Sequence, residues 1–203
     1  MYALVESGTI TKYFNNPKGF MLGDVQYSSD IFMKWSVEEK TAIGIHEVIF
    51  DDSNKKDEQW YINTDQSFAF VDGTVTASYG TATPIAHADT LFTAQDEIDG
   101  YGTEGEVAIR GLKYNLIRNL KVNVANELAI TDWYITRNSE KSTAIPSSIS
   151  THRDAVRTKQ AQMETAITNA SDTPALEALH TYTTTDSEGV QSRPLGELPV
   201  LES

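Results

Sequence analysis

Cysteine is absent from the 203 residues of this sequence, and basic residues are few. Without cysteine the chain has no disulfide scaffold, thiolate zinc site, iron–sulfur cluster or cysteine nucleophile. The 16 Lys and Arg residues face 29 Asp and Glu residues, which gives a formal net charge of −13. Nucleic acids and anionic lipid surfaces are bound largely through basic side chains. We therefore expect neither a nucleic acid nor a membrane as a partner.

Long apolar runs are also missing. No stretch approaches the roughly 20 apolar residues that span a bilayer. Residues 1–14 do not combine a basic segment with a following apolar one, as a secretory signal does. The sequence therefore predicts a soluble protein made without an export signal.

Arginine and glycine are unevenly distributed along the chain. Residues 1–103 carry six Lys, no Arg and sixteen Asp or Glu, whereas residues 104–182 carry nine basic and nine acidic residues. No glycine occurs between Gly111 and Gly189, as suits helices, while the glycines before this gap suit turns and strands. We predict an α+β fold with four parts: an acidic β-rich module (1–90), a connector (91–105), a helical hairpin module (106–182) and an extended tail (183–203).

The N-terminal module carries local signals for antiparallel strands. Ser7-Gly8 and Asp72-Gly73 each separate two strand-like segments, and Asp-Gly suits a type I′ turn because both central residues need a positive φ. Ser36 with Glu39 forms a capping-box pattern, which predicts a short helix closed by Gly44. The module is thus expected to be an antiparallel sheet with one short helix.

Apolar spacing predicts a long two-helix hairpin and a short third helix. The first helix is expected over residues 106–130, with one apolar stripe at Ile109, Leu112, Leu116, Leu120, Val124 and Leu128. The second should begin after Pro146, capped by Ser147 or Ser148, and bury Ile149, Val156, Met163 and Ala170. The third should start near Thr173, with Asp172 or Thr173 as its cap and Pro174 at its first position. Residues 131–137, between the two long helices, are rich in aromatic and β-branched residues, and we expect this segment to pack against the helical hairpin.

No catalytic pattern is present. The sequence lacks the common phosphate-loop, dinucleotide, zinc-protease and serine-hydrolase motifs. Its histidines show no metal-ligand spacing, and they are His46, His87, His152 and His180. The acidic loop 51–58 has Lys55-Lys56 where a calcium loop needs its sharp bend. We expect no enzyme activity, no catalytic or metal site and no cofactor.

A motif in the helical module resembles a known family. It reads T-D-W-x-x-x-R-x-x-E-x-x-x-x-I-P-x-x-I-x-x-x-R-x-x-V-R and comprises Thr131, Asp132, Trp133, Arg137, Glu140, Ile145, Pro146, Ile149, Arg153, Val156 and Arg157. This pattern is similar to a C-terminal module of bacteriophage tail proteins, among them tail-fibre assembly chaperones and small tail or baseplate-associated proteins. The chain departs from the pattern at His152, where an aromatic residue is usual. The resemblance covers about residues 112–170.

The motif supplies the candidate interaction residues. Trp133 and Tyr134 either fasten the segment between the helices or contact a partner. Arg153 and Arg157, one helical turn apart, form either a basic strip for an acidic neighbour or ion pairs within the chain, with Asp132, Glu140 and Asp154 as candidate partners. The complete set of expected protein-interaction residues is Trp133, Tyr134, Arg137, Arg153, Arg157, Leu120 and Val156.

The resemblance implies a structural tail component that acts by protein–protein assembly in the virion and is made in the host cytoplasm. The alternative is a tail-fibre assembly chaperone that binds the C-terminal region of a fibre and then leaves. Partners would be other tail proteins, in a homo- or hetero-oligomer. A host surface glycan or receptor is a further possible partner, which no residue pattern supports. A glycan site on the aromatic residues of the β module is weighed against a core role, and these residues are Trp60, Tyr61, Phe68, Phe70 and Tyr79. Apolar tail residues are expected to lie against another chain, namely Val190, Leu195, Leu198, Val200 and Leu201.

Overall fold

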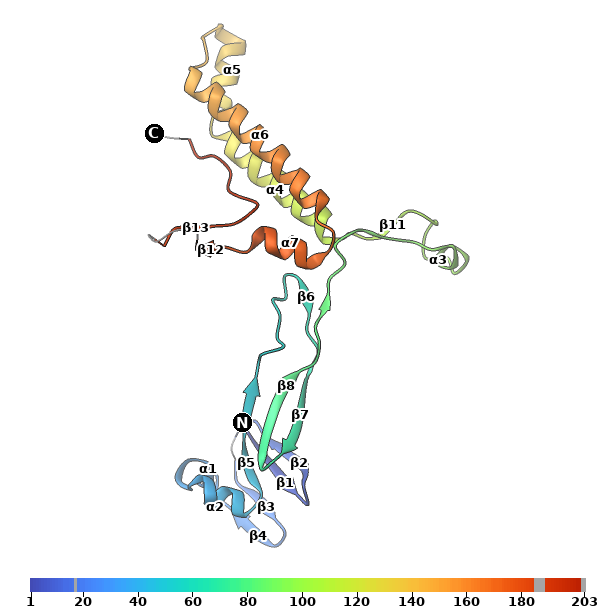
Figure 1. Cartoon of the computed structure of the whole chain (residues 1–203), viewed down its shortest axis with the longest axis vertical. Helices are drawn as coiled ribbons and strands as arrows, with labels where there is room; N and C mark the ends of the chain where they lie inside the picture. Colours follow the sequence, from blue (N-terminus) through green and yellow to red (C-terminus); the bar gives the residue numbers. More distant parts are fainter. Residues whose placement is uncertain (17, 185–188, 202–203) are drawn as a thin grey trace. The chain divides into compact units, whose positions relative to one another are not determined.

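The computed structural model of the chain describes residues 1–16, 18–184 and 189–201 (Figure 1). It confirms an α+β fold, with a strand-rich N-terminal part and long helices in the C-terminal part. Two compact units are present, Met1–Thr83 and Pro84–Ser203. The division therefore falls after Thr83, a few residues before the boundary at residue 90 that the sequence predicts.

A five-stranded sheet forms the centre of the first unit. Its order is β2-β1-β5-β8-β7, and the strands are β1 (Tyr2–Glu6), β2 (Thr9–Phe14), β5 (Ile45–Asp51), β7 (Gln66–Val71) and β8 (Thr74–Tyr79). Three of the four neighbouring pairs are antiparallel, but β5 and β8 run parallel, with Val48 opposite Val75. The prediction of a purely antiparallel module was wrong in this respect. Val48 and Val75 are both buried at this pairing.

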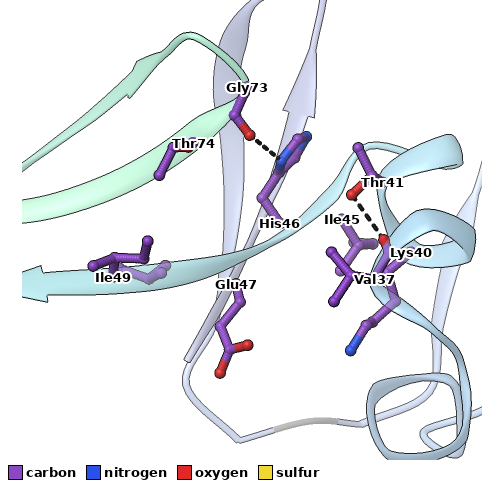
Figure 2. A pocket seen from close by; sticks show the side chains of 10 residues that line it. Val37, Lys40, Thr41, Ile45, His46, Glu47, Ile49, Gly73 and Thr74 are labelled. Atoms are coloured by element: carbon purple, nitrogen blue, oxygen red, sulfur yellow. Dashed lines mark hydrogen bonds between the residues drawn. The ribbon is translucent and has the colours of Figure 1, made fainter.

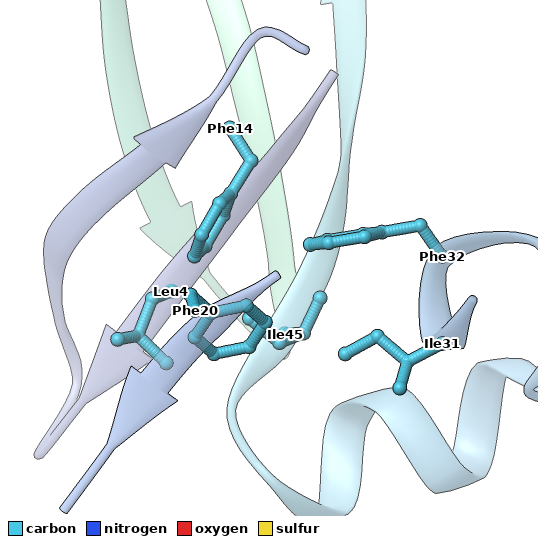
Figure 3. Packing of buried hydrophobic residues seen from close by; sticks show 6 residues of the cluster. All are labelled: Leu4, Phe14, Phe20, Ile31, Phe32 and Ile45. Atoms are coloured by element: carbon cyan, nitrogen blue, oxygen red, sulfur yellow. The ribbon is translucent and has the colours of Figure 1, made fainter. Parts of the chain in front are cut away.

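Short elements surround the sheet of the first unit. They are β3 (Phe20–Leu22), β4 (Val25–Tyr27), α1 (Ile31–Lys34), α2 (Val37–Ala42) and β6 (Tyr61–Ile62), and β9 (Thr83–Pro84) spans the division between the units. Figure 3 shows how β1, β2, β3, β5 and α1 contribute to one apolar cluster, which consists of Leu4, Phe14, Phe20, Ile31, Phe32 and Ile45. The Phe14 and Phe20 ring centroids lie 4.8 Å apart at a tilt of 50°. Burial of this cluster gives the first unit a hydrophobic core of its own.

The predicted turn and cap signals of the first unit are confirmed. Asp72 and Gly73 both have positive φ, at 48° and 79°, as a type I′ turn requires. Ser36 accepts the Glu39 N–H while Glu39 accepts the Ser36 N–H, which completes the capping box of α2. Gly44 follows α2 with a φ of 81°, and a Cβ there would lie 2.5 Å from the Val5 carbonyl oxygen. Only glycine suits that position.

Four helices build the second unit. They are α4 (Leu112–Ala129), α5 (Asp132–Lys141), α6 (Ser147–Asn169) and α7 (Thr173–His180). Helix α4 packs along α6, as the hairpin prediction required. The segment between them, expected only to pack, is a helix itself. Helix α6 has Pro146 at its N-cap and no side-chain cap, so the capping role predicted for Ser147 or Ser148 was wrong. For α7, Asp172 accepts the Ala175 N–H and Pro174 lies in the first turn, as predicted.

Residues 84–111 form an arm at the start of the second unit. It contains β10 (Thr90–Leu91), α3 (Ala94–Ile98) and β11 (Val107–Ile109), and β10 pairs with β11. The connector prediction missed this small folded hairpin. The helix predicted from residue 106 begins instead at Leu112, because Val107–Ile109 is a strand.

The C-terminal segment lies on its own chain. It includes β12 (Thr183–Thr184) and β13 (Gln191–Ser192), which pair with each other. Leu195 is buried, its N–H donates to the Leu179 carbonyl, and Glu197 accepts hydrogen bonds from Arg193 and Tyr182. Leu195 thus packs within the chain, contrary to the expectation of a second chain. Residues 185–188 and 202–203 of the predicted tail lie outside the described residues.

Candidate functional site: the α5 surface and its support

Arg153 is the structural centre of the motif. It points inward from α6 and is only 8 % exposed. Its Nη1 lies 2.8 Å from the Leu128 carbonyl oxygen, 2.7 Å from Thr131 Oγ1 and 2.8 Å from Asp132 Oδ1. Leu128 belongs to the last turn of α4, whose carbonyl groups lack partners within the helix. The Arg153 guanidinium donates to one of them, the Leu128 carbonyl, and complements the negative end of the helix dipole. Arg153 therefore fastens the turn between α4 and α5.

Arg157 behaves differently from Arg153. Its side chain is about half exposed, and Nη1 lies 3.2 Å from Asp154 Oδ1 on the same helix. One arginine thus lies inside the unit and the other lies outside. Both make ion pairs within the chain, to Asp132 and Asp154, so the structure favours the intrachain alternative over a two-pronged basic strip.

Helix α5 exposes the aromatic part of the motif. None of its ten residues is buried. The Trp133 and Tyr134 ring centroids lie 4.0 Å apart, and the Arg137 guanidinium lies 5.7 Å from the Trp133 ring centroid. Trp133 is 51 % exposed. We call Trp133, Tyr134 and Arg137 the α5 surface. Isolated helices this short are marginal in water, so the order of α5 depends on its attachment through Thr131 and Asp132.

Leu120 and Val156 support the fold. Leu120 of α4 and Val156 of α6 are buried, 7 % and 0 % exposed, and the two helices pack along each other. Their side chains form the core of the helical unit and leave no surface for a partner. This corrects the expectation that they take part in protein interaction.

His152, the departure from the family pattern, faces α4. Its Nε2 lies 3.0 Å from Glu127 Oε1, although the angles are not those of a hydrogen bond. Beside it, a hollow of about 440 Å³ is bordered by α6 and by the C-terminal residues Pro199, Val200 and Leu201. His152 therefore lies between Glu127 of α4 and this hollow, which it helps to line.

The first unit contains a hollow of about 480 Å³ between α2, the start of β5 and the turn before β8 (Figure 2). Figure 2 shows His46 turned toward this turn, where its Nδ1 lies 3.0 Å from the Gly73 carbonyl oxygen. Lys40 stands over the Tyr2 ring at 5.1 Å. Both contacts join residues of the first unit to one another.

In the described residues, no group of three or more His, Asp and Glu side chains could hold a metal ion. None of the helices formed by residues 1–16, 18–184 and 189–201 combines the length and apolar character needed to cross a bilayer. Three of the aromatic residues weighed for a glycan site take a core role: Trp60 is buried, and Phe68 and Phe70 pack against the buried Val48 and Val75. Tyr61 and Tyr79 are partly exposed.

Asp89 joins the two ends of the arm beside the N-terminus of α4. It accepts the Gly111 N–H at 2.8 Å and the Arg110 guanidinium at 2.6 Å. The Gly111 hydrogen bond and then the Arg110 hydrogen bond lower the pKa of the Asp89 carboxyl below its usual value.

Acidification should release this contact. A carboxyl with a lowered pKa in the folded state stabilises the fold above its ordinary pKa of about 3.9, and this contribution is lost as the pH falls through the folded value. The Gly111 amide resonance followed by NMR should therefore shift below about pH 4. Asp89→Asn should remove that shift, and a titration unchanged by Asp89→Asn would contradict the assignment.

Sequence reasoning missed part of this site. Thr131 is only 1 % exposed, and its Oγ1 accepts a hydrogen bond from Arg153 Nη1 at 2.7 Å. The same hydroxyl donates to the Leu128 carbonyl. The pairing of His152 with Glu127 was not foreseen either. The available signal was the Thr-Asp pair directly after the α4 stripe, since such residues commonly satisfy backbone groups at helix ends.

The chain was compared with protein-family models, curated proteins and solved structures. No family model, curated protein or solved structure matches it. The functional conclusion therefore depends on the residues and contacts described above.

Proposed function

We propose that this chain is a non-enzymatic structural component of a bacteriophage tail that acts by protein–protein assembly through the α5 surface. The resemblance of the Thr131–Arg157 motif to phage tail proteins supplies the context. The observation that carries the proposal is an exposed Trp133, flanked by Tyr134 and Arg137, on a helix with no buried residue.

The residue types of the α5 surface suit a protein interface. Tryptophan, tyrosine and arginine are the residues most enriched among interface positions that dominate binding energy. Trp133 and Tyr134 are large and rigid, and each carries one polar group that can form a hydrogen bond at the hydrated edge of an interface. The buried Arg153 holds the start of this helix in place, so the surface is presented in one orientation at a small entropic cost.

The surface area of the chain also supports assembly. The chain exposes 13194 Å². Two separate globular domains of the lengths of the two units would together expose only about 11,400 Å² by the scaling of monomeric proteins. Large apolar side chains are among the exposed groups, for example Ile130 at 61 % and Trp133 at 51 %, and such side chains favour contact with partners.

Mass spectrometry of purified virions tests the assignment. In particles produced from the genome that encodes this chain, a structural component should be present in a fixed ratio to the other tail proteins. Absence from virions together with recovery in a complex with a fibre during infection would establish the assembly chaperone instead. Absence from both would overturn a tail function.

Removing the α5 surface should deplete the chain from virions. Trp133→Ala combined with Arg137→Ala should reduce its amount per particle by about tenfold or more, because truncation of an interface anchor costs about 2 kcal/mol or more. Met33→Ala, at an exposed position of the first unit, is the control and should be incorporated normally. Circular dichroism should show both variants folded. Normal incorporation of the double variant would exclude the α5 surface as the contact.

A further inference from the structure

The arm at the start of the second unit is ordered but has no core. None of residues 84–110 is buried. Its base is fixed to α4, where the Leu112 and Lys113 N–H groups donate to the carbonyls of Ala86 and His87, both at 3.0 Å. Further out, the Phe92 N–H donates to the Glu106 carbonyl at 2.9 Å, and the Phe92 carbonyl accepts from the Gly105 N–H at 3.0 Å. The arm thus projects as a folded hairpin (Figure 1).

The arm is both apolar and acidic. Its exposed large side chains are Leu91, Ile98, Tyr101 and Ile109, between 49 % and 77 % exposed. Between Asp89 and Arg110 the sequence has five carboxylates and no basic residue, and the carboxylates are Asp96, Glu97, Asp99, Glu104 and Glu106. Ile98 and Tyr101 at the outer end are the most exposed of the apolar set, at 77 % and 72 %.

Helix α4 carries a surface of the opposite character. A shallow groove of about 290 Å³ is lined by Tyr114, Ile117, Arg118 and Lys121. Tyr114 and Ile117 provide apolar area, and the other two residues are cations. Lys121 has only a loose ion pair, 3.9 Å from Glu164, and Arg118 has none in the part of the chain that the structure describes.

We propose that the arm of one copy docks into the α4 groove of a second copy of this chain. The second copy is the occupant because one sequence supplies both halves, with opposite charge and matching apolar side chains. Docking would cover Ile98 and Tyr101 and would bring the arm carboxylates to Arg118 and Lys121, which steers encounter and fixes register. Two different patches meet, so the contact is heterologous and builds a closed ring or an open filament.

This assembly goes beyond the proposed function and uses different residues from the α5 surface. Analytical ultracentrifugation of the full chain tests it with two variants. The arm variant, Ile98→Ser with Tyr101→Ser, removes the two most exposed apolar side chains of the arm. The groove variant, Arg118→Glu with Lys121→Glu, changes the charge of the groove from positive to negative. The wild-type chain should show a mass that rises with concentration and falls with added salt. Each variant alone should be monomeric, with unchanged helicity.

Mixing the two variants is the decisive measurement. The intact arm of the groove variant should dock into the intact groove of the arm variant, so an equimolar mixture should form a heterodimer of twice 22.5 kDa and nothing larger. Lys18→Glu with Lys56→Glu makes the same charge change in the first unit and should assemble as wild type. A wild-type chain that stays monomeric up to about 1 mM, a variant that assembles normally, or a mixture that stays monomeric would each overturn the proposal. None of these results bears on incorporation into virions, so the two proposals fail independently.

Discussion

Leu120→Asp should unfold the helical unit. Leu120 is 7 % exposed on α4, which packs along α6. The substitution removes a buried apolar side chain and puts a carboxylate in its place without a cation to pair with it. Such a change costs about 4 kcal/mol or more, which is comparable to the whole stability of a small domain. We expect loss of most helical circular dichroism and rapid hydrogen exchange in residues 112–180.

A neighbouring position provides the matched control. Val122, two residues further along α4, is 54 % exposed, and Val122→Asp should change the free energy of unfolding by no more than about 0.5 kcal/mol. The first unit has its own apolar cluster, so its exchange protection should survive Leu120→Asp. If Leu120→Asp kept full helicity and lost only an oligomeric state, Leu120 would instead lie between chains.

Arg153→Met should cost about 2–3 kcal/mol of stability. Methionine keeps most of the buried aliphatic volume but removes the guanidinium, so the Leu128 carbonyl and Thr131 lose a charged donor. Asp132 is 60 % exposed and regains water, which keeps the cost below that of a fully buried ion pair. The largest local effect should fall on α5, because no buried residue holds that helix.

Arg157→Met is the control, since it makes the same substitution one turn further along α6. The side chain of Arg157 is 52 % exposed, and exposed ion pairs contribute at most about 1 kcal/mol. Urea unfolding gives the two free energies, and hydrogen exchange of residues 132–141 reports on α5. Equal effects of the two substitutions would show that Arg153 does not fasten the turn. If the α5 surface mediates assembly, Arg153→Met should also lower incorporation into virions, although Arg153 contacts no partner.

The buried Arg153 positions the helix that carries the exposed Trp133. Arg153 joins the end of α4 to the start of α5, and the next residue after its partner Asp132 is Trp133. A short helix with little intrinsic stability is thereby held in a fixed direction with its aromatic side chains exposed. The motif residues thus divide into a buried set that positions the helix and an exposed set to which the proposed function assigns binding.

Local sequence signals predicted the elements whose causes are local. The Asp72-Gly73 turn, the Ser36–Glu39 capping box, and the Asp172 cap with Pro174 each depend on residues within a few positions of one another, and the structure confirms all three. Apolar spacing likewise indicated the packing of α4 on α6, because the 3.6-residue period places the buried residues on one face.

Tertiary structure alone decided the features that depend on distant residues. Strands β5 and β8 pair in parallel, with the buried Val48 opposite the buried Val75. No turn joins these two strands directly, so no local sequence signal specified their pairing. Ile109 fits the apolar stripe predicted for the first long helix, but pairing of Val107–Ile109 with β10 made this segment a strand. Arg153 and Arg157 are one turn apart and alike in sequence, yet only Arg153 lies against the end of α4. The sequence by itself determined turns, caps and helix faces, and packing between elements decided which arginine supports the fold and which aromatic residues remain exposed.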